Sequence, residues 1–252
     1  MKIIALDIGN TNTKLQIDQD AVLVLNNAAI FAHTQPLDFT LTEPCQIHCS
    51  SVIQDPATAL ILDYVQQRLT QVTTIKRWYS SQILQLALPQ QYSKLTHLGS
   101  DRALRIYALS QLDHEQPQLG IGCGSAFTIE IVYRQQLIVS LILPGLTMQL
   151  NSLSSNTAKL PQLDASSIAT VLATAQPLTT EHAIAAGIIG SYCALIESLQ
   201  QRYAPQQSIC SGAYAPLIGN SVDNSKLNLS LKLHLETAVL QHLAQRHTLS
   251  NA

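Results

Sequence analysis

The chain has 252 residues, 46% hydrophobic and 12% charged, a composition that excludes a disordered or polyelectrolyte chain. This length fits one large domain or two modest ones. With 14 Lys and Arg residues against 16 Asp and Glu residues, and a net charge of -2, the chain lacks the basic excess with which proteins bind nucleic acids or anionic membranes.

The first predicted element is a strand, a tight turn and a second strand. An apolar run from Ile3 to Leu6 leads into a turn at residues 7–14, after which Leu15 and Ile17 alternate with polar residues. The apolar run is too short for a secretory signal, so we expect a cytoplasmic protein.

This turn is suited to binding a phosphate. Gly9 lets the backbone approach a ligand closely, and successive amide N–H groups in such a turn form an anion-binding concavity. Asp7, at the end of a buried strand, could hold Mg²⁺ or a water on that phosphate. A Walker A loop is excluded, because its second glycine is missing and a strand follows. Turn composition alone favours an ordinary Asn/Gly hairpin with a surface lysine.

The next predicted elements are a strand around Cys49 and two amphipathic helices, at residues 60–69 and 102–112. Cys45, His48 and Cys49 are near one another, but a tetrahedral zinc site needs four ligands and no second pair of Cys or His completes it. Cys49 is therefore interpreted as a small core residue. The five cysteines, an odd number scattered along the chain, indicate reduced thiols.

The second of these helices begins with Gly99, Ser100, Asp101 and Arg102. An Asp at this position is most often a cap or a partner of the helix dipole. A functional interpretation also exists, because a carboxylate can take the proton of a hydroxyl that accepts a phosphoryl group, and an Arg beside it can grip an acidic substrate. Asp101 and Arg102 supply both groups. The sequence does not show whether Asp101 meets Asp7 in space.

A second strand–turn–strand pattern at residues 119–133 follows the polar stretch from Asp113 to Gln118, where we place a domain boundary. The expected domains are residues 1–115 and 116–252. The offset that aligns Gly9 with Gly124 also aligns Thr13 with Thr128, which indicates a half-length repeat. A strand follows the glycines of this second turn, which excludes a dinucleotide-binding loop.

The second half continues with a long apolar helix at residues 180–200, an alternating strand at residues 227–233 and a helix at residues 236–245. The longest apolar stretch, Ala183 to Ile196, contains glycines and polar residues and falls short of the ~20 residues that a membrane span requires. We therefore expect neither a membrane nor a nucleic acid as a partner.

In order and spacing, the motifs together resemble the type III pantothenate kinase family. Residues 7–14 match its DxGNT phosphate motif, residues 99–102 match its GxDR motif, and residues 143–146 and 157–161 match its PGL and TAxLP segments. Further agreement comes from residues 51–53, Tyr92 and residues 180–187, so the resemblance runs from end to end.

The resemblance implies an α/β fold of two ribonuclease-H-like lobes, as in the acetate and sugar kinase, actin and heat-shock chaperone superfamily, with a nucleotide in the cleft between the lobes. It also implies the ATP-dependent phosphorylation of pantothenate to 4'-phosphopantothenate, the first step of coenzyme A biosynthesis. The enzyme would be a homodimer whose C-terminal lobe carries the dimer interface.

The resemblance further implies residue roles. The residues that would line the ATP phosphates are Asp7, Ile8, Gly9, Asn10, Thr11, Asn12, Thr13, Lys14 and Ser125. Those that would form the pantothenate pocket are Tyr92, Gly99, Ser100, Asp101 and Arg102, with Thr180 from the neighbouring subunit. Asp7 would lie near Mg²⁺, and Asp101 would accept the proton of the pantothenate hydroxyl.

Two positions depart from the family pattern. Its second hairpin begins with an Asp that ligates a monovalent cation, potassium or ammonium, where this chain has Gly122. The ion would lose its only charged ligand, so we predict either cation-independent activity or weakened turnover. A glycine of the adenine-side turn is replaced by Ala213, which would restrict the backbone if a positive φ is needed there, so nucleotide affinity could change.

Two other functions are compatible with these residues. A catalytically silent homologue with a ligand-binding or regulatory role is suggested by Gly122 and Ala213. A kinase of the same superfamily that acts on another hydroxyl acid or sugar would bind ATP without recognising pantothenate.

Overall fold

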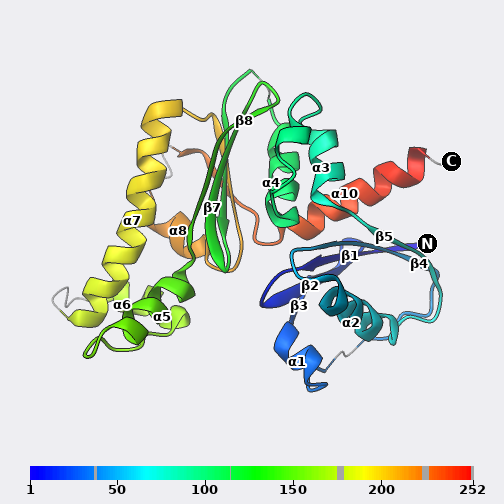
Figure 1. The fold of residues 1–252 in the computed structure, drawn as a ribbon, viewed down its shortest axis with the longest axis horizontal. Helices are drawn as coiled ribbons and strands as arrows, with labels where there is room; N and C mark the ends of the chain where they lie inside the picture. The colour runs from blue at the N-terminus through cyan, green and yellow to red at the C-terminus, as the bar shows by residue number, and fades with distance from the viewer. Residues whose placement is uncertain (37–38, 114, 175–178, 223–226, 251–252) are drawn as a thin grey trace. The chain divides into compact units, whose positions relative to one another are not determined.

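The computed structural model describes residues 1–36, 39–113, 115–174, 179–222 and 227–250. These residues form two compact units (Figure 1). The first unit is Met1–Gln111 together with His234–Ala252, and the second is Leu112–Leu233. Their division lies close to the expected boundary at residues 115 and 116, but the last helix belongs to the first unit instead of the second. His114 of the expected boundary stretch lies outside the described residues.

The first unit contains a sheet in the order β3-β2-β1-β4-β5. Its strands are β1 (Lys2–Ile8), β2 (Asn12–Ile17), β3 (Leu23–Asn26), β4 (Cys45–Ser51) and β5 (Val72–Arg77). Its helices are α1 (Asn27–Phe31), α2 (Asp55–Gln66), α3 (Ser80–Ala87), the short 3₁₀ helix η1 (Tyr92–Lys94), α4 (Ser100–Ser110) and α10 (Leu235–Ser250).

The second unit contains a sheet in the order β10-β9-β6-β7-β8. Its strands are β6 (Gln118–Cys123), β7 (Ala126–Tyr133), β8 (Gln136–Pro144), β9 (Gln207–Ser211) and β10 (Leu229–Leu231). Its helices are α5 (Leu146–Asn156), the 3₁₀ helix η2 (Ala165–Ser167), α6 (Ile168–Ala173), α7 (Thr180–Tyr203) and α8 (Ala215–Ser221).

The two sheets have the same topology, which confirms the two-lobe fold that the half-length repeat indicated. In each, three antiparallel strands follow one another, and two further strands add in parallel on the other side of the first. The register corrects one detail. Thr13 pairs with Ile8, whereas Thr128 pairs with Gly122, because the second turn is one residue shorter.

Alternation along β1 separates two faces of the first sheet. Ile4, Leu6 and Ile8 pack in a core with Ile61 and Val65 of α2, as period-2 burial requires. The opposite face is covered by α10, which contacts β1, and by α4, which contacts β4, while α3 packs against α4 (Figure 1). The contact of α10 with β1 explains why the last helix joins the first unit.

In the second unit, the inward residues of β6 and β7 form a core with α7. Within the described residues, α7 is one helix that is long and apolar enough to cross a membrane. The buried face of α7 includes Ile188, Tyr192 and Ile196, which belong to this core. All five cysteines are buried and none forms a disulfide, and Cys49 lies in the core of the first unit as predicted.

Candidate phosphoryl-transfer site

The turn between β1 and β2 is closed by its own backbone. The Gly9 N–H donates a hydrogen bond to the Asn12 carbonyl at 3.0 Å. A Cβ atom added to Gly9 would lie 3.0 Å from the same oxygen, so glycine suits this close approach. The residues at its tip, Asn10, Thr11 and Asn12, are exposed.

A buried asparagine that the sequence patterns did not single out holds this turn in place. The Asn27 side-chain amide donates to the Gly9 carbonyl at 2.8 Å, and its Oδ1 accepts from the Thr13 hydroxyl at 2.8 Å. The Asn27 backbone N–H also donates to the Thr11 carbonyl at 3.0 Å. Asn27 follows directly on the N-cap residue of α1, so in the sequence it resembles an ordinary helix start. The turn is therefore preorganised before any ligand binds.

Two charged side chains of the predicted motif face each other across the hairpin. Asp7 and Lys14 are cross-strand partners, and the Lys14 Nζ lies 3.4 Å from Asp7 Oδ2. The same Nζ lies 2.9 Å from Oε2 of Glu236 on α10. Asp7 and Glu236 are both buried, with 6% and 4% of their surface exposed. Glu236 was not among the candidates from the sequence.

The charges of these groups are coupled. Burial raises the pKa of Asp7 to about 6, Lys14 opposes that shift, and repulsion from Glu236 and Asp101 adds to it. Burial alone would lower the pKa of Lys14, but Glu236 and Asp7 raise it above its ordinary value. Lys14 therefore stays protonated. Packing places the start of α4 near the end of β1, because a Cβ atom on Gly99 would lie 3.6 Å from Val52 Cγ1 and the Val52 N–H donates to the Ile8 carbonyl at 3.1 Å.

Asp101 stands in the first turn of α4. Gly99 is the N-cap residue, and a Cβ atom added to it would lie 2.7 Å from Asp101 Oδ1, so the carboxylate folds back over the start of the helix. Ser100 and Arg102 are buried on either side. Among the described residues, the Ser100 hydroxyl has no hydrogen-bond partner, although its oxygen is fully buried.

The other predicted site residues are divided between the units. Tyr92 is half-buried in η1 of the first unit, with residues 7–14 and 99–102. Ser125 and Thr180 belong to the second unit, and both are exposed. Thr180 is the first residue of α7.

The second hairpin is built from closely packed backbone. The Gly124 N–H donates to the Ala126 carbonyl at 3.1 Å, and the Gly145 N–H donates to the Ser125 carbonyl at 3.2 Å. A Cβ atom added to Gly145 would lie within 2.5 Å of the Gly124 carbonyl oxygen and still closer to that of Ser125. Gly145 therefore allows the start of α5 to support this turn.

The turn at residues 211–213, which the resemblance places on the adenine side, corrects the expectation about Ala213. The positive φ in this turn belongs to Gly212, at +98°, and Ala213 is not among the residues with positive φ. A Cβ atom added to Gly212 would lie 2.5 Å from the Cys123 carbonyl oxygen. The alanine thus stands where glycine is not needed.

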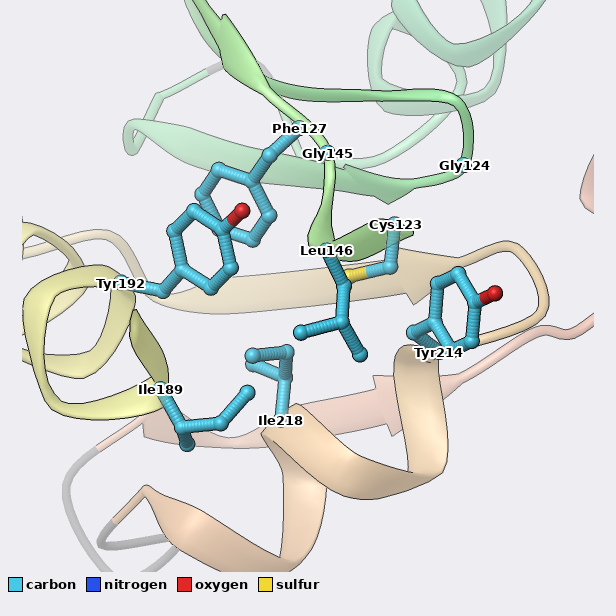
Figure 2. A pocket seen from close by; sticks show the side chains of 9 residues that line it. All are labelled: Cys123, Gly124, Phe127, Gly145, Leu146, Ile189, Tyr192, Tyr214 and Ile218. Atoms are coloured by element: carbon cyan, nitrogen blue, oxygen red, sulfur yellow. The ribbon is translucent and has the colours of Figure 1, made fainter. Parts of the chain in front are cut away.

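A small apolar pocket lies beneath the second hairpin (Figure 2). In Figure 2 the rings of Phe127 and Tyr192 lie stacked at one side of it, with centroids 4.0 Å apart. The Tyr192 hydroxyl donates to the Pro144 carbonyl at 2.7 Å and accepts from the Gln149 amide at 2.8 Å. These contacts fix the junction that carries Gly145, and the apolar lining is unsuited to a charged phosphate.

Gly122, where the resemblance leads us to expect a cation ligand, carries no side chain. Gly122 is buried in β6 opposite Thr128 of β7. In the described part of the chain, no group of three or more His, Cys, Asp or Glu residues could hold a metal ion.

Comparisons with known proteins identify a family for this chain. The family model described as "Type III pantothenate kinase" matches residues 3–202. The chain is 29% identical over 227 residues to a type III pantothenate kinase of Acinetobacter baylyi, covering 86% of this chain and 88% of that protein. It is 30% identical over 176 residues to one of Janthinobacterium sp. (strain Marseille), covering 66% of each.

One solved structure shares the fold across the whole chain. It is the crystal structure of a conserved putative Baf family transcriptional activator from Campylobacter jejuni, which has a TM-score of 0.60 and 17% identity. The superposition covers 97% of this chain and 98% of that one.

Proposed function

The chain belongs to the type III pantothenate kinase family, and from this premise we propose which residues carry out its reaction. That reaction is the ATP-dependent phosphorylation of pantothenate in coenzyme A biosynthesis. The observation that carries the assignment of residues is the packing of the start of α4 beside the end of β1, through the contact of Gly99 with Val52 and the hydrogen bond from the Val52 N–H to the Ile8 carbonyl. It brings the candidate proton acceptor near the phosphate turn, as transfer of a phosphoryl group to a hydroxyl requires.

Residues 7–14 and Ser125 bind the ATP phosphates in this proposal. The exposed tip of the first turn presents backbone N–H groups, and Asn27 keeps that tip in one conformation. Lys14 adds a positive charge, because its amino group stays protonated at neutral pH. Ser125 offers a hydroxyl at the exposed tip of the second hairpin.

Asp101 accepts the proton of the pantothenate hydroxyl as the phosphoryl group transfers. Because the transition state of phosphoryl transfer is loose, Asp101 contributes through position as well as basicity. Arg102 binds the pantothenate carboxylate, and the buried Ser100 hydroxyl supplies a further hydrogen bond. Gly99 and Tyr92 complete the pocket.

Asp7 fits a role toward Mg²⁺. This ion keeps several waters and is often held by one or two carboxylates together with substrate phosphates, so a single buried Asp beside the turn is sufficient. Bound there, the ion would neutralise phosphate charge. The protein's own contribution is to hold the Asp7 carboxylate beside Lys14.

The monovalent cation does not fit the position where the family holds it. Gly122 supplies no side-chain oxygen. We therefore propose that turnover is either independent of potassium and ammonium or weaker than with the carboxylate present.

We place the reaction in the cytoplasm and propose a homodimer in which α7 contributes to the interface. Small residues, Ala183, Gly187, Gly190 and Ala194, line one exposed face of α7 and would allow a second helix to approach closely. A Cβ atom added to Gly187 meets nothing within 4 Å, so Gly187→Gln should fit the isolated chain. Light scattering should then show a dimer for the wild type and a monomer for this variant. A variant that stays dimeric contradicts the assigned face.

The decisive test is phosphopantothenate production by the pure protein with ATP and Mg²⁺, with sodium, potassium or ammonium as the only monovalent cation. We expect product in all three series, and Asp101→Asn serves as the reference with strongly reduced kcat. Product only with potassium or ammonium would mean that other groups hold the ion.

Two results would change the functional assignment. Binding of pantothenate and nucleotide without product in any series would indicate the silent, regulatory homologue. ATP binding without competition by pantothenate would indicate a kinase for another hydroxyl acid or sugar.

A further inference from the structure

The last helix of the chain reaches the phosphate turn from outside the segment that the family model matches, residues 3–202. It packs against β1 and α4 within the first unit (Figure 1). Glu236 lies in its first turn and is only 4% exposed. A buried carboxylate costs free energy unless it is paired, so its partners indicate why it is there.

The partners of Glu236 come from β2 and α4, the two elements that carry Lys14 and Asp101 in the proposed function. Its Oε2 atom lies 2.9 Å from the Nζ of Lys14 on β2. Attraction to Lys14 and then to Arg105 of α4 holds the pKa of Glu236 below its ordinary value, although burial opposes that shift. Arg105 follows Asp101 by one helical turn, so both residues lie on the same side of α4. Glu236 thus interacts with the cation of the hairpin and with the helix that carries the proton acceptor.

We propose that Glu236 is a positioning residue for phosphoryl transfer, which holds the Lys14 ammonium group in the phosphate turn and ties that turn to α4. This role rests on the proposed function of Lys14 and Asp101. It adds a residue from the C-terminal helix to the machinery.

The distances show what Glu236 changes. The Lys14 Nζ lies closer to Glu236, at 2.9 Å, than to Asp7, at 3.4 Å. Without the Glu236 charge, Lys14 would form a tight pair with Asp7 alone. That pair would neutralise the carboxylate assigned to Mg²⁺ and draw the ammonium group away from the phosphates. Glu236 therefore attracts Lys14 in competition with Asp7. In the proposal this leaves Asp7 available for Mg²⁺ and Lys14 available for the phosphates.

The experiment compares Glu236→Gln with a matched control on the same helix. The Gln241 amide of α10 is also buried and donates to the Ile3 carbonyl at 3.1 Å and the Gln16 carbonyl at 3.3 Å, and neither hydrogen bond involves Lys14. Gln241→Leu therefore weakens the docking of α10 without changing the charge beside Lys14. Both variants are made in the full chain. Their melting temperatures are measured first, so that the kinetics are recorded at a temperature at which both are folded.

We expect Glu236→Gln to raise KM for ATP by about tenfold and to leave KM for pantothenate within about twofold. Gln241→Leu should lower the melting temperature and leave both KM values within about twofold. An equal rise in KM for ATP in the two variants would overturn the proposal, because general docking of α10 would explain it. An unchanged KM for ATP and unchanged kcat in Glu236→Gln would overturn it as well.

A double-mutant cycle with Lys14→Met tests whether Glu236 acts through Lys14. In the Lys14→Met background, Glu236→Gln should change kcat/KM for ATP by less than about twofold. Full additivity of the two effects would contradict the proposal. The affinity of the same four proteins for ADP is also measured by calorimetry. If the wild type binds ADP but makes no phosphopantothenate, the proposed function fails, whereas the cycle still supports or refutes the positioning role.

Discussion

The two hairpins of this chain have the same topology but different chemistry. At one, Asp7 faces Lys14 and a buried carboxylate from α10 completes a charged group. At the other, the corresponding pair is Gly122 and Thr128, and the turn is supported by close contact with Gly145. A duplicated fold can thus place charge in one unit and closely packed backbone in the other.

This difference indicates how each hairpin would bind a phosphate. The first would combine backbone N–H groups with the side-chain ammonium group of Lys14. Two carboxylates, Asp7 and Glu236, keep that group protonated. The second would rely on backbone geometry and the Ser125 hydroxyl, because Gly122 and Thr128 stand where the first hairpin has charged side chains. Substitutions that remove charge should therefore affect the first unit most, and a substitution that adds volume at Gly145 should affect the second.

The largest effect is expected for Asp101→Asn in the first unit. The amide keeps the shape of the side chain but cannot accept the proton, so kcat should fall by about 100-fold or more while the melting temperature hardly changes. Ser125→Ala in the second hairpin should lower kcat only by a few-fold. Steady-state kinetics give the kcat of both variants. Equal losses in the two would remove the contrast between the units.

The second effect is a volume change at Gly145. Its φ of −71° suits alanine, so any cost of Gly145→Ala comes from the collision with the backbone of Gly124 and Ser125. Overpacking of this kind costs roughly 1–3 kcal/mol. Thermal unfolding should show a melting temperature lower by about 3 to 10 °C, with a raised KM for ATP.

The control for this test is Gly124→Ala. A Cβ atom there would lie 3.9 Å from its nearest neighbour, which is an ordinary contact. Its melting temperature should stay near that of the wild type. If both variants lose the same stability, tight packing at Gly145 is not the reason.

The third prediction concerns the buried charge of Asp7. Its pKa is raised to about 6, so above that pH the folded chain carries an unfavourable carboxylate that Asp7→Asn removes. The variant should be inactive and yet more stable than the wild type by roughly 1–3 kcal/mol at pH 7 without Mg²⁺. As the pH falls below 6, Asp7 becomes protonated in the folded state and the advantage shrinks, disappearing below its ordinary pKa of 3.8. Denaturation of both proteins from pH 4 to pH 8 measures this. A gap that widens toward acid pH would contradict the assigned cause.

The smallest effect compares glycines in the two turns. A Cβ atom on Gly9 would lie 3.0 Å from the Asn12 carbonyl oxygen, against 3.9 Å for the nearest neighbour of Gly124. Gly9→Ala requires the first turn to shift by a few tenths of an ångström, so we expect a KM for ATP higher by about two- to fivefold. Gly124→Ala should leave that KM unchanged. The reverse order would mean that the second turn is the less tolerant one.

Much of the fold follows from local patterns. Alternation along β1 and β2 and along β6 and β7 predicted both hairpins, and helical spacing predicted α2, α4, α7 and α10. The ends differed by a few residues; α2, for example, begins at Asp55, where a Pro follows, and not at Leu60. The domain membership of α10 could not be read from the sequence, because an amphipathic helix does not reveal which sheet its apolar face will meet.

The site divides in the same way. The amino-acid sequence by itself determined the turn residues, Asp101 at a helix start and the glycines that permit close backbone contact, because each depends on residues within a few positions. Only the tertiary structure decided that Glu236 meets Lys14, 222 residues away along the chain, and that Asn27 clamps the turn. It also decided that Gly212, and not Ala213, needs a positive φ. Such pairings depend on how packed elements bring distant side chains together, and burial then sets the strength of their charges.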